Sequence, residues 1–150
     1  MRRTIASTFG VGLVPRRLWG SDTGAGTFGA GAAWLLAAPW WGWEWWVVAA
    51  LAVIATSASL WSAAPFAAGG RDPGWVCIDE TAGTLVALIG LTGWGWVTAA
   101  AVARMADIYK VLPGISPAER LPGPIGVTID DIIAGGYGLA AGWLVAALTG

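Results

Sequence analysis

Residues 76–110 read VCIDETAGTLVALIGLTGWGWVTAAAVARMADIYK, and this stretch decides which fold the chain can adopt. As one α-helix it would be about 52 Å long at 1.5 Å per residue, well beyond the roughly 30 Å of a bilayer core. Gly93 and Gly95 stand in its middle, where they favour a turn. The stretch therefore predicts a helical hairpin with arms at residues 75–91 and 96–110.

The composition is typical of a membrane protein. Of the 150 residues, 57% are apolar and 11% are charged, against about 25% charged in a soluble domain. Residues 23–43, 45–68, 81–103 and 132–150 carry no charge, and each stretch approaches or exceeds the roughly 20 residues of a spanning helix. The 12 Trp residues suit the headgroup boundary, above all the run at residues 40–46. A very apolar soluble bundle is the alternative.

The rest of the chain predicts further helices around the hairpin. Glycine, proline and charged residues separate the apolar runs, which gives helices at about residues 26–41 and 45–67 and a last one from about 126 to the end. Four prolines in residues 111–124 prevent a single helix there. We predict an all-α, multihelical integral membrane bundle of about five helical segments, forming one domain over residues 1–150. Gly138 and Gly142 would let a neighbouring helix approach closely, and a homo-oligomer is compatible with such faces.

The basic residues predict the orientation of this bundle. With five segments and a cytoplasmic N-terminus, residues 1–23, 68–75 and the end of the fourth segment through 124 lie inside, and they hold all 8 Lys and Arg residues. The outer turns near Gly42 and Gly93 hold none, which agrees with the positive-inside rule. No signal-peptide core follows the basic start, so we expect the N-terminus to be retained. The net charge of −1 indicates no nucleic-acid partner.

Charged residues in or beside membrane helices are costly and usually mark function. Here they form three clusters, namely Asp79 with Glu80, then Arg104, Asp107 and Lys110, and finally Asp130 with Asp131. Glu80 lies 11 residues before Leu91 and Asp107 lies 12 residues after Gly95, so the two arms of the hairpin bring their acids to one height. The third cluster begins the last helix at the same end. We expect the three clusters to share one site.

The side chains in these clusters indicate a hard metal ion. Five carboxylates cannot all stay ionised around one point without cations. Oxygen ligands without any His indicate Mg²⁺ first and Mn²⁺ or Ca²⁺ next, and such ions suit a phosphate substrate. Arg104 and Lys110 would then grip the phosphate. In the alternative interpretation the two cations only pair with the acids, and Asp130 with Asp131 only caps a helix N-terminus.

Two other phosphatase chemistries lack the residues they need. The absence of His excludes a histidine nucleophile. Cys77 has Gly83 six positions later, where a cysteine phosphatase loop needs Arg. As the single cysteine it forms no internal disulfide, and we interpret it as a small apolar core residue.

The charged motifs resemble those of the phosphatidylglycerophosphatase A family. IDETAG at residues 78–83 is similar to the family's I-D-E-x-x-G, RMADIYK at 104–110 to R-x-x-D-x-x-K, and GVTIDDIIAG at 126–135 to G-x-x-x-D-D-x-x-A-G. FGVG at 9–12 and GTFG at 26–29 resemble its N-terminal glycine motif. The ordered set covers most of the chain. Ala25, Ala30, Ala106 and Val111 stand where the family commonly has Pro, Ser, Phe and Pro, and these differences leave the charged set intact.

The resemblance implies a Mg²⁺-dependent enzyme that hydrolyses phosphatidylglycerophosphate to phosphatidylglycerol and phosphate, in glycerophospholipid biosynthesis. The enzyme would be a multi-pass protein of the bacterial inner membrane, its site facing the cytoplasm and its lipid substrate in the cytoplasmic leaflet. The resemblance also assigns residue roles: phosphate contact to Arg104 and Lys110, and metal binding and water activation to Asp79, Glu80, Asp107, Asp130 and Asp131.

Thr27 is a further candidate for phosphate binding. It follows the glycine segment at residues 24–26, which either presents backbone N–H groups to phosphate or only permits close helix packing. Two rival functions stay open beside the phosphatase. One is a small divalent-cation transporter that uses the same carboxylates, and the other is a non-catalytic membrane subunit whose acids hold a partner.

Overall fold

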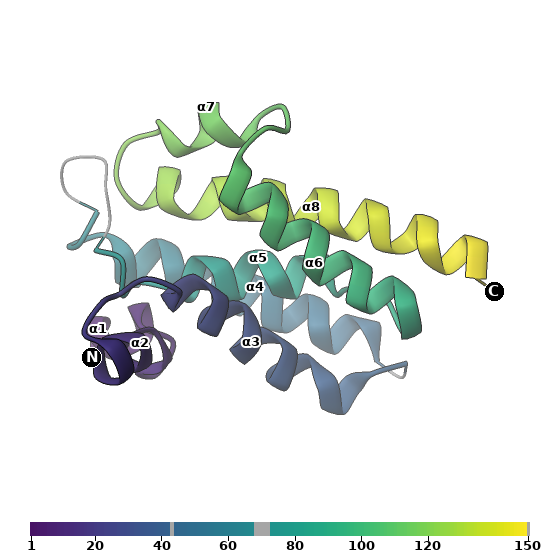
Figure 1. Cartoon of the computed structure of the whole chain (residues 1–150), viewed down its shortest axis with the longest axis horizontal. Helices are drawn as coiled ribbons and strands as arrows, with labels where there is room; N and C mark the ends of the chain where they lie inside the picture. The colour runs from purple at the N-terminus through teal and green to yellow at the C-terminus, as the bar shows by residue number, and fades with distance from the viewer. Residues whose placement is uncertain (43, 68–72, 150) are drawn as a thin grey trace.

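The computed structural model describes residues 1–42, 44–67 and 73–149, and every regular element within them is helical (Figure 1). The prediction of an all-α fold is confirmed. The described part of the chain forms eight α-helices and two short 3₁₀ helices, written η. In chain order they are α1 (Arg2–Ala6), η1 (Val11–Leu13), α2 (Val14–Trp19), α3 (Ala25–Ala37), η2 (Ala38–Trp40), α4 (Trp45–Ala63), α5 (Ile78–Ala87), α6 (Gly93–Tyr109), α7 (Ile115–Glu119) and α8 (Pro124–Thr149).

The helical hairpin predicted from residues 76–110 is present as α5 and α6. The chain turns at Gly90 and Gly93, whose φ angles of 71° and 54° suit glycine. Gly95, which we predicted in the turn, lies inside α6 instead. A Cβ there would come within 2.7 Å of the Gly142 carbonyl oxygen, so this glycine serves helix packing.

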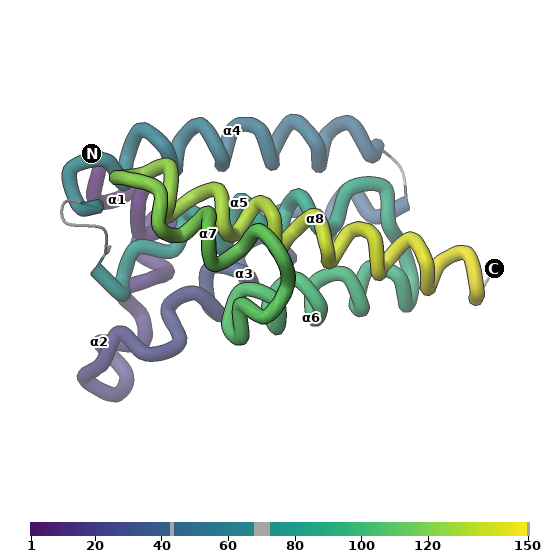
Figure 2. The backbone as a smooth tube through the Cα atoms, turned by 90° about the horizontal axis from the view of Figure 1, so that it is seen from above, coloured from purple at the N-terminus to yellow at the C-terminus, as the bar shows by residue number. Residues whose placement is uncertain are grey.

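α8 packs against both arms of the hairpin, and glycines make the approach close. A Cβ on Gly138 would lie 2.7 Å from the Cβ of Ala103 in α6. On the α5 side, a Cβ on Gly135 would overlap the Gly83 backbone. The predicted close approach at Gly138 and Gly142 is therefore confirmed, and the neighbouring helix is α6 of the same chain. α4 lies on the other side of α5 and α8 from α6 (Figure 2).

Residues 1–23, for which the sequence predicted no helix, contain α1, η1 and α2. The backbone N–H of Cys77 donates a hydrogen bond of 2.9 Å to the Ala6 carbonyl oxygen, and the hydroxyls of Thr8 and Thr81 are 3.0 Å apart. These contacts hold the residues just before and inside the first turn of α5. The segment therefore helps to fix where α5 begins.

Several predicted boundaries are wrong by a few residues, mostly at prolines. The first long helix stops at Ala37, where Pro39 brings in η2, and α4 stops at Ala63, two residues before Pro65. The proline-rich segment at residues 111–124 contains the short α7. Trp43 of the predicted tryptophan run lies outside the described residues, as does most of the predicted inner region 68–75, including Arg71.

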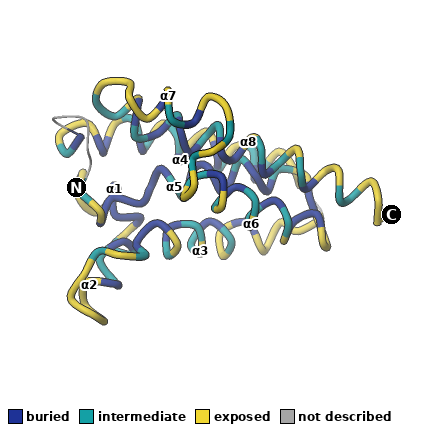
Figure 3. Tube along the Cα trace, turned by 45° about the horizontal axis from the view of Figure 1, so that its top comes forward, coloured by how far each residue is buried: buried dark blue, intermediate teal, exposed yellow. Residues whose placement is uncertain are grey.

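In the described part of the chain, two helices are long and apolar enough to cross a membrane: α4 with 19 residues and α8 with 26. α5 has 10 residues and is buried along most of its length, whereas α2 and the end of α8 are largely exposed (Figure 3). Large apolar side chains stand on the outside of the bundle, among them Val53, Ile54, Trp94 and Leu144. Such a surface suits a lipid environment.

The two turns that we predicted on the outer side lie together. A Cβ on Gly42 would be 3.3 Å from the Thr92 side chain, and one on Gly90 would be 3.6 Å from the Cβ of Trp45. This end therefore gathers tryptophans, while α5 begins and α6 ends away from it (Figure 1).

Candidate active site

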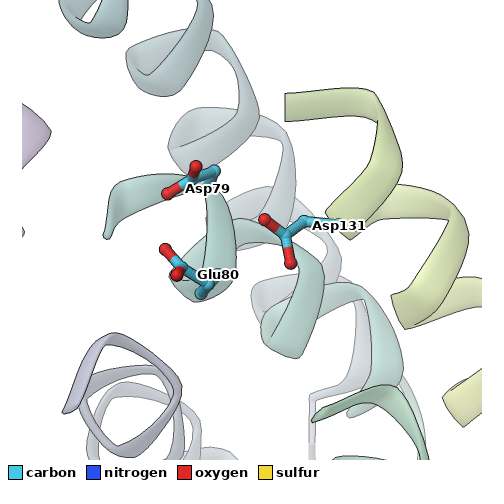
Figure 4. Close-up of side chains that lie close together, drawn as sticks. All are labelled: Asp79, Glu80 and Asp131. Carbon is cyan, nitrogen blue, oxygen red and sulfur yellow. The ribbon is translucent and has the colours of Figure 1, made fainter. Parts of the chain in front are cut away.

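Three carboxylates meet where α5 begins. Asp79 and Glu80 stand in the first turn of α5, and Asp131 reaches them from α8 (Figure 4). One carboxylate oxygen from each of the three lies within 4.8 Å of the others, so the group could hold a metal ion. Asp79 and Asp131 are buried, with exposed fractions of 4% and 7%. We call these three residues the acidic triad.

The sequence builds this triad through a small residue between the two helices. A Cβ on Gly83 would lie 2.8 Å from the backbone carbonyl carbon of Asp131, which only a glycine avoids. Gly83 is one helical turn after Asp79 and Glu80, so this close contact draws α8 against the first turns of α5. The N-terminal end of α5 also favours negative charge through its helix dipole.

Arg104 lies beside the triad on α6. Its Nη1 donates a hydrogen bond to Oδ2 of Asp107 and lies 3.9 Å from Oε1 of Glu80. The spacing of three residues between Arg104 and Asp107 places both side chains on one face of the helix. A cavity of about 10 Å³ is lined by Glu80, Arg104, Asp107 and Asp131 together with small neighbours. That is about the volume one water molecule needs.

Lys110 and Asp130 form a second group next to the triad. The Lys110 Nζ lies 2.8 Å from Oδ2 of Asp130 and 2.8 Å from Oε1 of Glu119. Burial disfavours the charged amine, but these two hydrogen bonds outweigh it and raise the pKa of Lys110 above its ordinary value. Asp130 also accepts a hydrogen bond of 3.0 Å from the Asp131 backbone N–H. Asp130 therefore contacts the ammonium group of Lys110, whereas its neighbour Asp131 belongs to the triad.

Thr27 does not join these groups. Its side chain is exposed on α3 and borders an apolar groove with Val11 and Val14. Gly26, its neighbour, is the residue that touches the site: a Cβ there would come within 2.6 Å of the Arg104 Nη2 and would overlap the Glu80 carboxylate. The glycine segment therefore packs closely against the site, as one of its two interpretations expects. Glu119, which contacts Lys110, is a site neighbour that the sequence did not single out. Gly26 belongs to the glycine segment that the sequence marked, but its contact with Glu80 and Arg104 was not predicted.

The triad fits a hard divalent cation. Burial raises the pKa of Glu80, which lies outside the two candidate spans, to about 8, with the Asp131 charge adding to the effect. Among the described residues, Oε2 of Glu80 is buried without a hydrogen-bond partner. A cation among the three carboxylates would stabilise their charged forms and satisfy that oxygen. Carboxylate oxygens, which make up this group, are ligands that Mg²⁺ and Mn²⁺ accept.

Fold and site together define a helical protein of membrane type with a buried acidic centre beside an arginine. The family model of Phosphatidylglycerophosphatase A matches residues 4–146, so the chain belongs to that family of lipid phosphatases. This match confirms the resemblance seen in the sequence motifs.

A Bacteroides thetaiotaomicron protein named "Putative phosphatidylinositol-3-phosphatase" is 38% identical to the chain over 98 residues. That match covers 61% of the chain and 61% of the relative's length. No solved structure matches the chain.

Proposed function

We propose that this chain is a Mg²⁺-dependent phosphatase that hydrolyses phosphatidylglycerophosphate to phosphatidylglycerol and phosphate. The observation that carries the proposal is the buried acidic triad beside Arg104, in a chain of the phosphatidylglycerophosphatase A family. We further propose that residues 1–150 act as one domain in the bacterial inner membrane. The site would face the cytoplasm, where the phosphate headgroup of an inner-leaflet lipid can reach it.

In this proposal each charged group has its own task. Asp79, Glu80 and Asp131 would hold the metal ion, which would neutralise charge on the phosphate oxygens when bound. Arg104 would contact the phosphate with its guanidinium group. Asp107 borders the same cavity outside the triad and would accept the proton of the attacking water. A bond forms from that water to phosphorus, while the glycerol oxygen leaves and takes up a proton.

Lys110 and Asp130 take a supporting part in this scheme. Lys110 is held between Asp130 and Glu119, outside the triad, and would lend positive charge near Asp107. The cavity of about 10 Å³ has no room for a phosphate group. Substrate binding would therefore need the Arg104 side chain to turn from Asp107 toward the incoming phosphate.

The substrate is the finer part of the proposal and has one rival with an observation behind it. The name of the Bacteroides relative refers to phosphatidylinositol 3-phosphate, and that lipid is also a phosphate monoester. The buried triad and Arg104 would serve either headgroup, because they address the phosphate. We favour phosphatidylglycerophosphate because the family match covers residues 4–146, much more of the chain than the relative does.

Phosphate release by the detergent-purified protein tests the proposal. We expect Mg²⁺-dependent release from phosphatidylglycerophosphate that a chelator reduces to background and that added Mg²⁺ restores. Release from phosphatidylinositol 3-phosphate under the same conditions should be at least about tenfold slower, a difference of roughly 1.4 kcal/mol in the barrier. The opposite preference would contradict the substrate assignment alone. No release from either lipid by folded protein, with metal flux in proteoliposomes, would favour the transporter.

A further inference from the structure

We infer that the apolar groove along α3 takes an acyl chain of the lipid substrate while its phosphate lies at the acidic triad. The groove has a volume of about 460 Å³ and is lined by Val11, Val14, Thr27, Phe28, Gly31, Ala32 and Leu35. Thr27 carries its one hydroxyl group, and the remaining lining is apolar. The inference rests on the proposed function and names the part of the protein that recognises the lipid tail.

α3 presents two different faces, and this is what places the groove beside the site. Ala25, Gly26, Gly29, Ala33 and Ala37 are buried against the rest of the bundle. The groove residues occupy a neighbouring face, since Thr27, Gly31 and Leu35 follow each other at intervals of four. Gly26 contacts Glu80 and Arg104, and Thr27 is the next residue along the helix. One end of the groove is therefore one residue away from the site.

The direction of α3 matches the shape of a phospholipid. From Thr27 to Leu35 the helix advances about 12 Å, away from the triad and toward the end where the tryptophans gather. A lipid whose phosphate lies at Arg104 would thus place its headgroup in the polar site and its acyl chain in the apolar groove. Val11 and Val14 of the N-terminal segment also line this groove. An acyl chain is the occupant with the matching chemistry.

Gly31 gives a way to fill the groove without disturbing the bundle. A Cβ on Gly31 would meet nothing within 4 Å, so a larger side chain there projects into the open groove. Gly136 on α8 is the matched control, because it is also an exposed helical glycine whose Cβ would meet nothing within 4 Å. Gly136 lines neither the groove nor the cavity at the triad.

The test compares dioleoyl and dihexanoyl phosphatidylglycerophosphate as substrates of Gly31→Phe, Gly136→Phe and the wild type in the same detergent micelles. We expect Gly31→Phe to lower the long-chain to short-chain ratio of kcat/KM by about tenfold or more, because the ring displaces apolar contacts of the longer chain. Gly136→Phe should keep the wild-type ratio. Ala32→Leu, on the same face of α3, serves as the second variant if Gly31→Phe does not purify in folded form.

The outcomes separate this inference from the function on which it rests. An inactive wild type would reject the proposed function. If the wild type is active and both phenylalanine variants keep its ratio, the groove does not bind the acyl chain. A fall in the ratio for both variants would also reject it, because the effect would then come from the lipid environment. If Gly31→Phe only converts an oligomer to a monomer and keeps the ratio, the groove is a contact between copies of the chain.

Discussion

Replacing Asp131 with Asn is expected to lower kcat/KM for phosphatidylglycerophosphate by about 10²-fold or more. The change keeps the shape of the side chain and removes the charge that α8 contributes to the triad. A metal ion supplies several kcal/mol of charge stabilisation, and each 1.36 kcal/mol corresponds to a factor of ten in rate. The measurement is steady-state phosphate release at saturating Mg²⁺, with helix content checked by circular dichroism.

Asp130→Asn is the matched control for Asp131→Asn. Asp130 is the neighbouring residue, with the same chemistry and a buried side chain, but its Oδ2 contacts Lys110. We expect kcat/KM of the Asp130→Asn variant to fall by no more than about tenfold, which is the low end of what supporting partners of metal ligands contribute. Equal losses in both variants would show that Asp130 also binds the metal. Full activity in Asp131→Asn would remove the triad from the mechanism.

The second large effect is expected at Gly26, which carries no functional group. In Gly26→Ala the new methyl group would overlap the Glu80 carboxylate and press on the Arg104 guanidinium, so both side chains must shift. A displacement of about 1 Å at a catalytic group can reduce the rate by about 10²-fold. We expect a loss of at least tenfold in kcat for phosphate release.

The helix itself should tolerate this change, because alanine is about 0.5–1 kcal/mol better than glycine inside a helix. Gly136→Ala is the matched control, with open space around the new methyl group, and it should keep normal kcat. If Gly26→Ala is as active as Gly136→Ala, then the close contact of α3 with Glu80 and Arg104 has no bearing on catalysis.

Sequence patterns were sufficient for the hairpin and for the depth at which its charges meet. Helical rise predicted that Glu80 and Asp107 lie at one height, and in the structure both border the same cavity, where Glu80 is also 3.9 Å from Arg104. What the patterns could not separate is the role of adjacent acids. Neighbours on a helix point about 100° apart, and only the packing of α8 decides that Asp131 meets the triad and Asp130 meets Lys110.

The sequence also could not show which residue at the start of α3 meets the site. A glycine segment before a helix has the same composition whether it binds phosphate or permits close packing. The structure places Gly26 against the site and Thr27 on the neighbouring face, which a sequence without tertiary contacts does not reveal. The N-terminal helices were missed for a similar reason. They are five and six residues long, and a hydrogen bond from the distant residue Cys77 supports α1.

The central claim is that the acidic triad binds the divalent cation on which phosphate release depends. Its most direct test is a titration of the purified protein with Mn²⁺, followed by the electron paramagnetic resonance signal of the free ion. We expect saturable binding to the wild type, competition by Mg²⁺, and at least about tenfold weaker binding in Asp79→Asn and Asp131→Asn. Unchanged Mn²⁺ affinity in folded forms of both variants would contradict the account.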